Sequence, residues 1–109
     1  IDHGACLYFH HSWTDWETHA KSPFPLVKNH VLLSKATLLA ETDAVFKQLL
    51  TEEKIRAIVA LIPDEWLQWR DTEETPAMLR EVYGRYLTTR LKHSDIFTKK
   101  AQDEREALV

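Results

Sequence analysis

The residues of this sequence that could do chemistry gather at its beginning, where Ile1-Asp2-His3-Gly4 precedes an apolar stretch. A magnesium ion that bridges the phosphates of ATP takes only one or two carboxylates from a protein, and an aspartate can supply one of them. A neighbouring glycine permits the sharp turn that aims this carboxylate. On these residues alone, Asp2 is more typical of a turn or surface carboxylate near a chain end. Its role as a candidate metal ligand rests on a family resemblance that further stretches of the chain carry.

Six histidines suggest a second kind of metal site, one for a transition metal. The residues that could contribute are His3, His10, His11, His19 and His30, with Asp15 and Glu17. Adjacent histidines on a strand point to opposite faces, and neither an HEXXH motif nor another regular ligand pair occurs. The spacing therefore favours scattered histidines at the surface or in the core, and we predict no zinc site.

The single cysteine, Cys6, excludes an internal disulfide and a cysteine-based zinc cluster. Its neighbours Ala5 and Leu7 are apolar and no basic residue stands beside it, which is typical of a buried thiol and not of a nucleophile. This cysteine usage favours a reducing, cytoplasmic setting. No apolar run approaches the ~20 residues that cross a bilayer, and no signal-like start is present, so we expect no membrane association.

The composition indicates an ordinary globular domain. With 44% hydrophobic and 28% charged residues, a chain of 109 residues can bury a core of its own. Two glycines and four prolines leave little room for a many-turned β fold. The formal net charge of -3 argues against a general nucleic-acid binder. Basic residues prevail only between Arg80 and Lys100, where their spacing is typical of the solvated faces of amphipathic helices.

The first third of the chain, residues 1–33, predicts an irregular arm that wraps a core with its aromatic side chains. Pro23 and Pro25 interrupt regular structure around Phe24, and residues 5–9 read as a short buried strand. A strand without neighbours exposes unpaired backbone groups along an edge. We therefore expect that two copies of the chain could pair through it as a homodimer.

From Ser34 onward apolar residues recur at intervals of three and four, which predicts a helical bundle over residues 34–109. Thr51 can cap a helix that Pro63 ends, and residues 64–67 then make a single turn. Thr75 followed by Pro76 is an N-cap with proline at the first helical position, which predicts a helix of about four turns. Ser94 is expected to cap the last helix. The predicted fold is mainly α, with the arm and the bundle forming one compact domain that has at most a short strand or hairpin.

One core is expected to unite the apolar faces of these helices. Its predicted members are Leu38, Phe46, Leu49, Ile55, Ile58, Ile62, Trp66, Leu67, Leu79, Tyr83, Leu87, Leu91 and Phe97. If Trp66 is buried there, truncating it to Ala should cost on the order of 3–5 kcal/mol. Arg80 and Arg90 could pair with Asp64 and Glu65, which would fix the turn that contains Trp66 to the third helix.

Three stretches together resemble the HipA-like serine/threonine kinases. They are the Ile1-Asp2-His3-Gly4-Ala5-Cys6-Leu7 segment, the Ile62-Pro63-Asp64-Glu65-Trp66-Leu67 turn, and a helix that carries Arg80, Tyr83, Tyr86-Leu87 and Arg90-Leu91. In that family an apolar strand residue precedes a metal-binding aspartate, and X-Gly takes the place of the Phe-Gly of ordinary protein kinases. The resemblance covers nearly the whole chain and implies the C-terminal helical lobe of such a kinase.

The resemblance implies that the intact parent transfers phosphate from ATP to Ser or Thr of a protein substrate, with Asp2 holding Mg²⁺. The phosphate loop, the nucleotide-binding lysine, the catalytic aspartate and the metal-binding asparagine of the family would all precede Ile1. Because the chain opens with Ile1 and not Met, we expect a piece of a longer protein, without catalytic residues, bound cofactor or activity of its own. The alternative is a small α-helical protein-interaction module with no catalytic activity.

Overall fold

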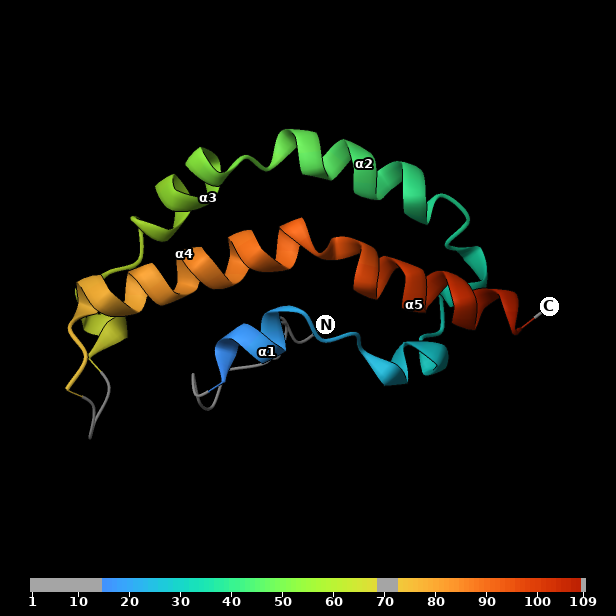
Figure 1. Cartoon of the computed structure of the whole chain (residues 1–109), viewed down its shortest axis with the longest axis horizontal. Coiled ribbons are helices and arrows are strands. Elements are labelled where there is room, and N and C mark those ends of the chain that lie inside the picture. The colour runs from blue at the N-terminus through green and yellow to red at the C-terminus, as the bar shows by residue number, and fades with distance from the viewer. Residues whose placement is uncertain (1–14, 69–72, 109) are drawn as a thin grey trace.

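The computed structural model describes residues 15–68 and 73–108, and this part of the chain consists of helices and short helical turns, without a strand (Figure 1). The α-helices are α1 (Trp16–Ala20), α2 (Leu39–Leu49), α3 (Glu52–Val59), α4 (Pro76–Lys92) and α5 (Ser94–Glu106). The 3₁₀ turns are η2 (Pro25–Asn29), η3 (Leu33–Lys35) and η4 (Asp64–Leu67). The predicted mainly α fold is confirmed. Asp2 and the predicted strand over residues 5–9 lie outside the described residues.

Helices α4 and α5 follow each other end to end and form the middle layer of the molecule (Figure 1). On one side α3 packs against α4 and α2 packs against α5, while on the other side α1 packs against α4 and η2 against α5. The α4–α5 pair therefore lies between two layers, one formed by α2 and α3 and the other by α1 and η2.

Two of the three predicted helix starts are confirmed. The Thr51 hydroxyl accepts a hydrogen bond from the backbone N–H of Lys54, and the Thr75 hydroxyl accepts one from Met78, both at 3.2 Å. Each bond satisfies a backbone donor that the helix itself cannot pair. The predicted cap at Ser94 is wrong, because His93 is the N-cap residue of α5 and Ser94 lies inside the helix, 1% exposed.

The described part of the predicted arm is more regular than expected. It contains α1, which follows Asp15 at a backbone φ of 61°, a conformation that Asp tolerates better than most residues. Pro25 occupies the first position of η2. A residue at this position has no helical partner for its N–H, so a proline costs no hydrogen bond and can begin the turn. The first long helix also begins later than expected from the sequence, at Leu39.

The core is small and lies around α4. Tyr86 is fully buried against Ala20, with Trp16, Tyr83 and Leu87 packed around them. Six further apolar residues of the described part of the chain are buried, namely Leu33, Ile55, Val59, Leu67, Leu79 and Ala101. The predicted burial of Ile55, Leu67 and Leu79 is confirmed, and Ile62, Leu91 and Phe97 are partly buried.

Five predicted core residues are exposed instead: Leu38, Phe46, Leu49, Ile58 and Trp66. Helical spacing shows that residues share a face, but not whether that face has a partner, and α2 contains no buried residue. Trp66 is 72% exposed because the tight 3₁₀ turn directs its neighbour Leu67 into the core. The large destabilisation expected for Trp66→Ala therefore does not apply.

Candidate functional site

Arg80 on α4 holds the turn that precedes η4. Its Nε and Nη2 donate to the carbonyl oxygen of Ile62 at 3.1 and 2.7 Å, and Nη2 also donates to Oδ1 of Asp64. The predicted pairing of Arg80 with Asp64 is thus confirmed. Two bonds to one carbonyl and one to a carboxylate use the fixed fork of a guanidinium, which fixes the position of the turn more strictly than a lysine could.

Arg90, two to three helical turns further along α4, holds the end of α1 by hydrogen bonds. Its Nη1 donates to the carbonyl oxygens of His19, Ala20 and Ser22 at 3.4, 3.3 and 3.1 Å. These carbonyls lie in the last turn of α1 and just after it, where the backbone dipoles attract a cation. The predicted pairing of Arg90 with Asp64 and Glu65 is wrong, because ten residues of helix separate Arg90 from Arg80 by about 15 Å.

Side-chain packing adds to the bonds that hold α1 on α4. The guanidinium of Arg85 lies 5.2 Å from the ring centroid of Trp16, a cation–π contact. Burial raises the pKa of Tyr83 above its ordinary value, since ionising its phenol would place a charge in a poorly hydrated position. Tyr86 is fully buried against Ala20, so the α1–α4 contact contains a buried cluster as well as these bonds.

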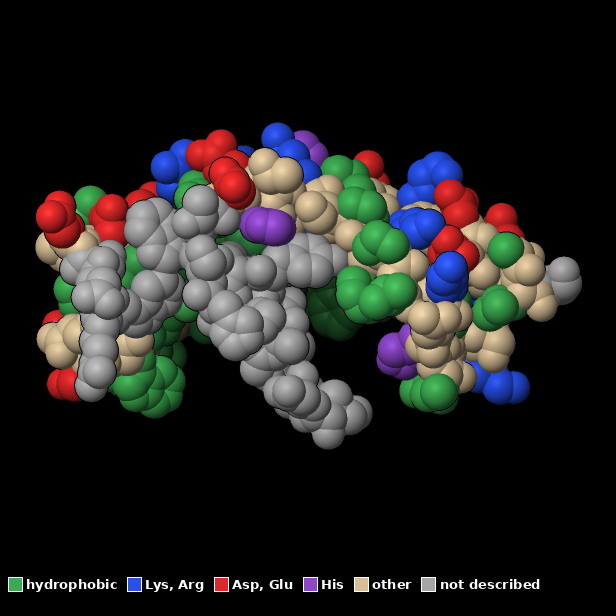
Figure 2. Space-filling model, turned by 90° about the horizontal axis from the view of Figure 1, so that it is seen from below, with side chains coloured by type: hydrophobic (Ala, Val, Ile, Leu, Met, Phe, Trp, Pro, Cys, Tyr) green, Lys and Arg blue, Asp and Glu red, His purple; other side chains and the backbone are tan. Residues whose placement is uncertain are grey.

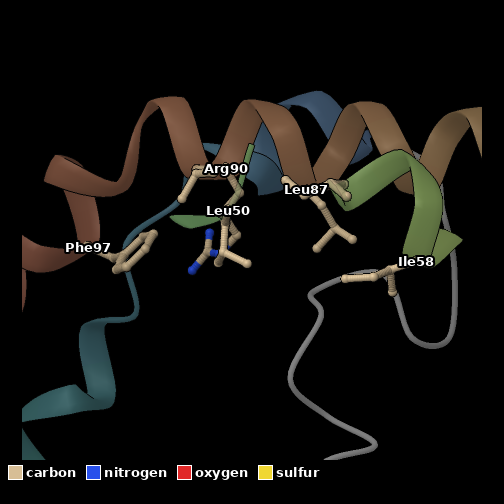
Figure 3. Close-up of a pocket in the computed structure, with 7 residues that line it drawn as sticks. Leu50, Ile58, Leu87, Arg90 and Phe97 are labelled. Atoms are coloured by element: carbon tan, nitrogen blue, oxygen red, sulfur yellow. The ribbon is translucent and has the colours of Figure 1, made fainter. Parts of the chain in front are cut away.

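An apolar groove, formed by two adjoining cavities, lies where α2 and α3 meet the middle layer. One cavity of about 300 Å³ is lined by Leu50, Ile55, Ile58, Leu87, Arg90, Leu91 and Phe97. The second, of about 400 Å³, shares Leu50, Leu91 and Phe97 with the first and extends along α2. In Figure 3 the Arg90 side chain projects into the groove beside Phe97, whose ring centroid lies 4.6 Å from the guanidinium carbon.

Two lysines of α5 form ion pairs within the helix. Lys99 pairs with Asp103 at 2.6 Å and Lys100 with Glu104 at 2.5 Å, each one helical turn apart. The hydrogen bond to Asp103 raises the pKa of Lys99. Figure 2 shows acidic and basic side chains interspersed toward this end of the molecule, as expected of a solvated helix face.

The predicted metal site lies outside the described part of the chain, since Asp2, His3, His10 and His11 all precede residue 15. Within residues 15–68 and 73–108 no group of three or more His, Cys, Asp or Glu side chains could hold a metal ion. His30 instead accepts a hydrogen bond at Nδ1 from the backbone N–H of Leu32, at 3.1 Å. No helix in the described ranges is long and apolar enough to cross a membrane.

The sequence left three features of this region unpredicted. The side chain of Arg56, on α3, pairs with Glu81 of α4 at 2.7 Å. It lies over Gly84, where an added Cβ would be 2.6 Å from Nη1 of Arg56. A glycine inside a helical pattern is the signal that could have indicated this close approach. Two other features left no such signal: the bonds from Arg90 to α1, and the burial of the Ser94 hydroxyl, which has no hydrogen-bond partner among the described residues.

Comparison with known proteins gives no match: no family model, no curated protein and no solved structure is similar enough to this chain to count as a relative.

Proposed function

We propose that this chain is the helical C-terminal part of a HipA-like protein kinase. In the longer protein it supports the site that transfers phosphate from ATP to protein Ser or Thr in the cytoplasm. By itself it has no activity. The proposal rests on the sequence resemblance, and one structural observation supports it: three of the α4 residues that carry the resemblance, Arg80, Tyr86 and Arg90, join separate segments of the chain.

Three of these α4 residues each fix a different contact. Arg80 binds the Ile62 carbonyl and Asp64, so it joins two of the resembling stretches directly. Tyr86 packs against Ala20 of α1, and Arg90 binds carbonyl oxygens in the last turn of α1 and just after it. A surface helix with no structural task would not need buried or multiply bonded residues at these positions.

Such a scaffold suits the chemistry of phosphoryl transfer. Catalysis in this reaction depends mostly on holding the phosphates, the metal ion and the acceptor hydroxyl in register. Asp2 would contribute one carboxylate to Mg²⁺, and α1 begins 14 residues after it, at Trp16. Fixing α1 on α4 would limit the movement of the polypeptide that carries this carboxylate.

The test is phosphate transfer from radiolabelled ATP by the longer protein that contains this chain, to itself or to a general protein substrate. Replacing Asp2 by Asn removes the charge and nearly keeps the shape, so transfer should be lost while the folding stability changes little. Asp15→Asn, at an exposed position that tolerates Asn, is the matched control and should leave transfer intact. Equal activity of the Asp2→Asn variant and the wild type would refute the metal role.

The exposure of large apolar side chains favours a second candidate, a helical protein-interaction module without catalytic activity. Besides the residues of α2, the η2–η3 region exposes Phe24, Leu26, Val31 and Leu32, and Leu61 is 80% exposed. Exposed apolar side chains that gather into a patch mark protein–protein interaction sites. Two results would favour this function. The longer protein would transfer no phosphate, and its binding to a partner would be lost when these residues are made polar.

A further inference from the structure

Basic residues do not prevail only in residues 80–100, as expected above, but also in a second part of the chain. Residues 18–40 contain Lys21, Lys28 and Lys35 and no Asp or Glu, although acids outnumber Lys and Arg over the whole chain by 17 to 14. We call residues 18–40 the acid-free stretch. Because it holds three of the 14 positive charges and none of the 17 negative ones, the rest of the chain has a clear excess of negative charge.

The three lysines of the acid-free stretch form no ion pair with a described residue. On α5, which packs against η2 and η3, Lys99 and Lys100 instead pair with Asp103 and Glu104. Two carboxylates of the neighbouring helix are thus already engaged, and its two other acids lie in its first and last turns. The positive charge of the acid-free stretch is left for a partner to neutralise.

Large apolar side chains of the same stretch are exposed. Phe24, Leu26 and Leu32 are exposed, Val31 is 89% exposed, and η2 contains no buried residue. Lys28 lies among these residues in the sequence. A surface that combines apolar side chains with charge of one sign is complementary to a partner that combines apolar side chains with charge of the opposite sign.

The surface is held in place by the fold. The backbone N–H of His30 donates to the Val27 carbonyl and that of Leu33 to the His30 carbonyl, each at 3.0 Å, which links η2 to η3. Leu33 is buried and both turns pack against α5 (Figure 1). A partner therefore meets a surface that is already ordered, so binding costs less conformational entropy.

We propose that residues 24–35 bind an acidic segment of a partner protein, one that carries apolar side chains among its Asp and Glu residues. The proposal rests on the second candidate function, the interaction module, and names the chemistry of its partner. An anionic membrane offers charge of the same sign. It is a broad surface, however, and would also meet the negatively charged remainder of the chain, whereas a peptide segment contacts residues 24–35 alone.

The test is fluorescence anisotropy of the chain with three labelled synthetic peptides of equal length. They have Leu at the same positions and Glu, Ser or Lys at all others. The Glu peptide should bind most tightly, and added salt should weaken its binding. Lys28→Glu should weaken it by about fivefold or more, because an attraction becomes a repulsion. Lys54→Glu makes the same change at an exposed lysine of α3 without an ion pair and should have little effect.

The apolar part of the surface is tested by Val31→Ser. Because Val31 is almost fully exposed, the variant should fold normally, yet it should bind the Glu peptide several times more weakly. Leu61→Ser is the matched control, since Leu61 is 80% exposed and lies outside the acid-free stretch. Unchanged affinity of Val31→Ser, or an equal loss in both variants, would contradict a role of this surface.

The remaining outcomes separate this proposal from its alternatives. Equal binding of all three peptides, lost in Val31→Ser, would overturn the acidic partner and leave the interaction module standing. Failure of the Glu peptide to bind would overturn the proposal, while the binding test on the longer protein still decides the second candidate function. Sedimentation with vesicles of phosphatidylserine and phosphatidylcholine should show no binding. Binding to these vesicles but not to the Glu peptide would assign the surface to a membrane instead.

Discussion

Trp66 and Leu67 are adjacent, yet their side chains have opposite surroundings. Trp66 is 72% exposed and Leu67 is 2% exposed. We expect Leu67→Ala to lower the free energy of unfolding by about 2–5 kcal/mol, because it leaves a cavity in the core. Trp66→Ala should cost less than about 1 kcal/mol, since little buried surface is lost. Urea denaturation of both variants measures this, and a larger loss for Trp66→Ala would contradict the observed burial.

The half-buried phenol of Tyr83 makes the stability of the folded state depend on alkaline pH. Its pKa is raised above the ordinary value of 10.0 by burial, so near and above that pH the folded state holds more protons than the unfolded state. This contribution to stability is complete below about pH 10 and is lost as the pH rises through the folded-state pKa. Tyr83→Phe should make the decline of the unfolding free energy shallower there. Equal slopes for the variant and the wild type would exclude this role.

At the scale of elements, α4 depends on its cap. The Thr75 hydroxyl satisfies the N–H of Met78, so Thr75→Ala should lower the unfolding free energy by about 1 kcal/mol. Thr75→Ser keeps the hydroxyl and should retain most of the stability. Chemical denaturation compares the three proteins. A Ser variant as unstable as the Ala variant would show that the methyl group of Thr75, and not its hydroxyl, matters.

The local signals of the sequence predict where elements begin, and less of how they pack. Thr51 and Thr75 locate two helix starts because a cap acts on the next three residues only. The exposed Phe46 could not be distinguished from the buried Ile55, since both continue the same helical spacing and burial depends on a distant partner. The pairing of Arg80 with Asp64 could be predicted because the turn that contains Asp64 comes shortly before the helix that carries Arg80. The bonds from Arg90 to α1 could not be predicted, because their partners are distant in the sequence. The candidate metal ligand Asp2 stays a prediction from resemblance.

At the scale of the whole molecule, the proposed kinase origin predicts that this chain alone is unable to use ATP. Asp2 is a single carboxylate, and an Mg²⁺–ATP site also needs a phosphate cradle and further ligands, which the resemblance assigns to upstream sequence. Calorimetric titration of the chain with Mg²⁺ and ATP should therefore give no measurable binding, and no ATP should be hydrolysed. Tight binding by this chain alone would require a nucleotide site that its sequence does not predict.

The bonds of Arg90 join residues that are 68 to 71 positions apart in the chain. Closing a flexible loop of that length costs on the order of 4 kcal/mol of chain entropy, so this contact should form after the helices between its ends have been ordered. A contact that forms late on the folding pathway is also among the first to be lost when the protein begins to unfold. The α1 segment should therefore detach while α4 and α5 remain helical, which would make the N-terminal side of the molecule the first target of a protease.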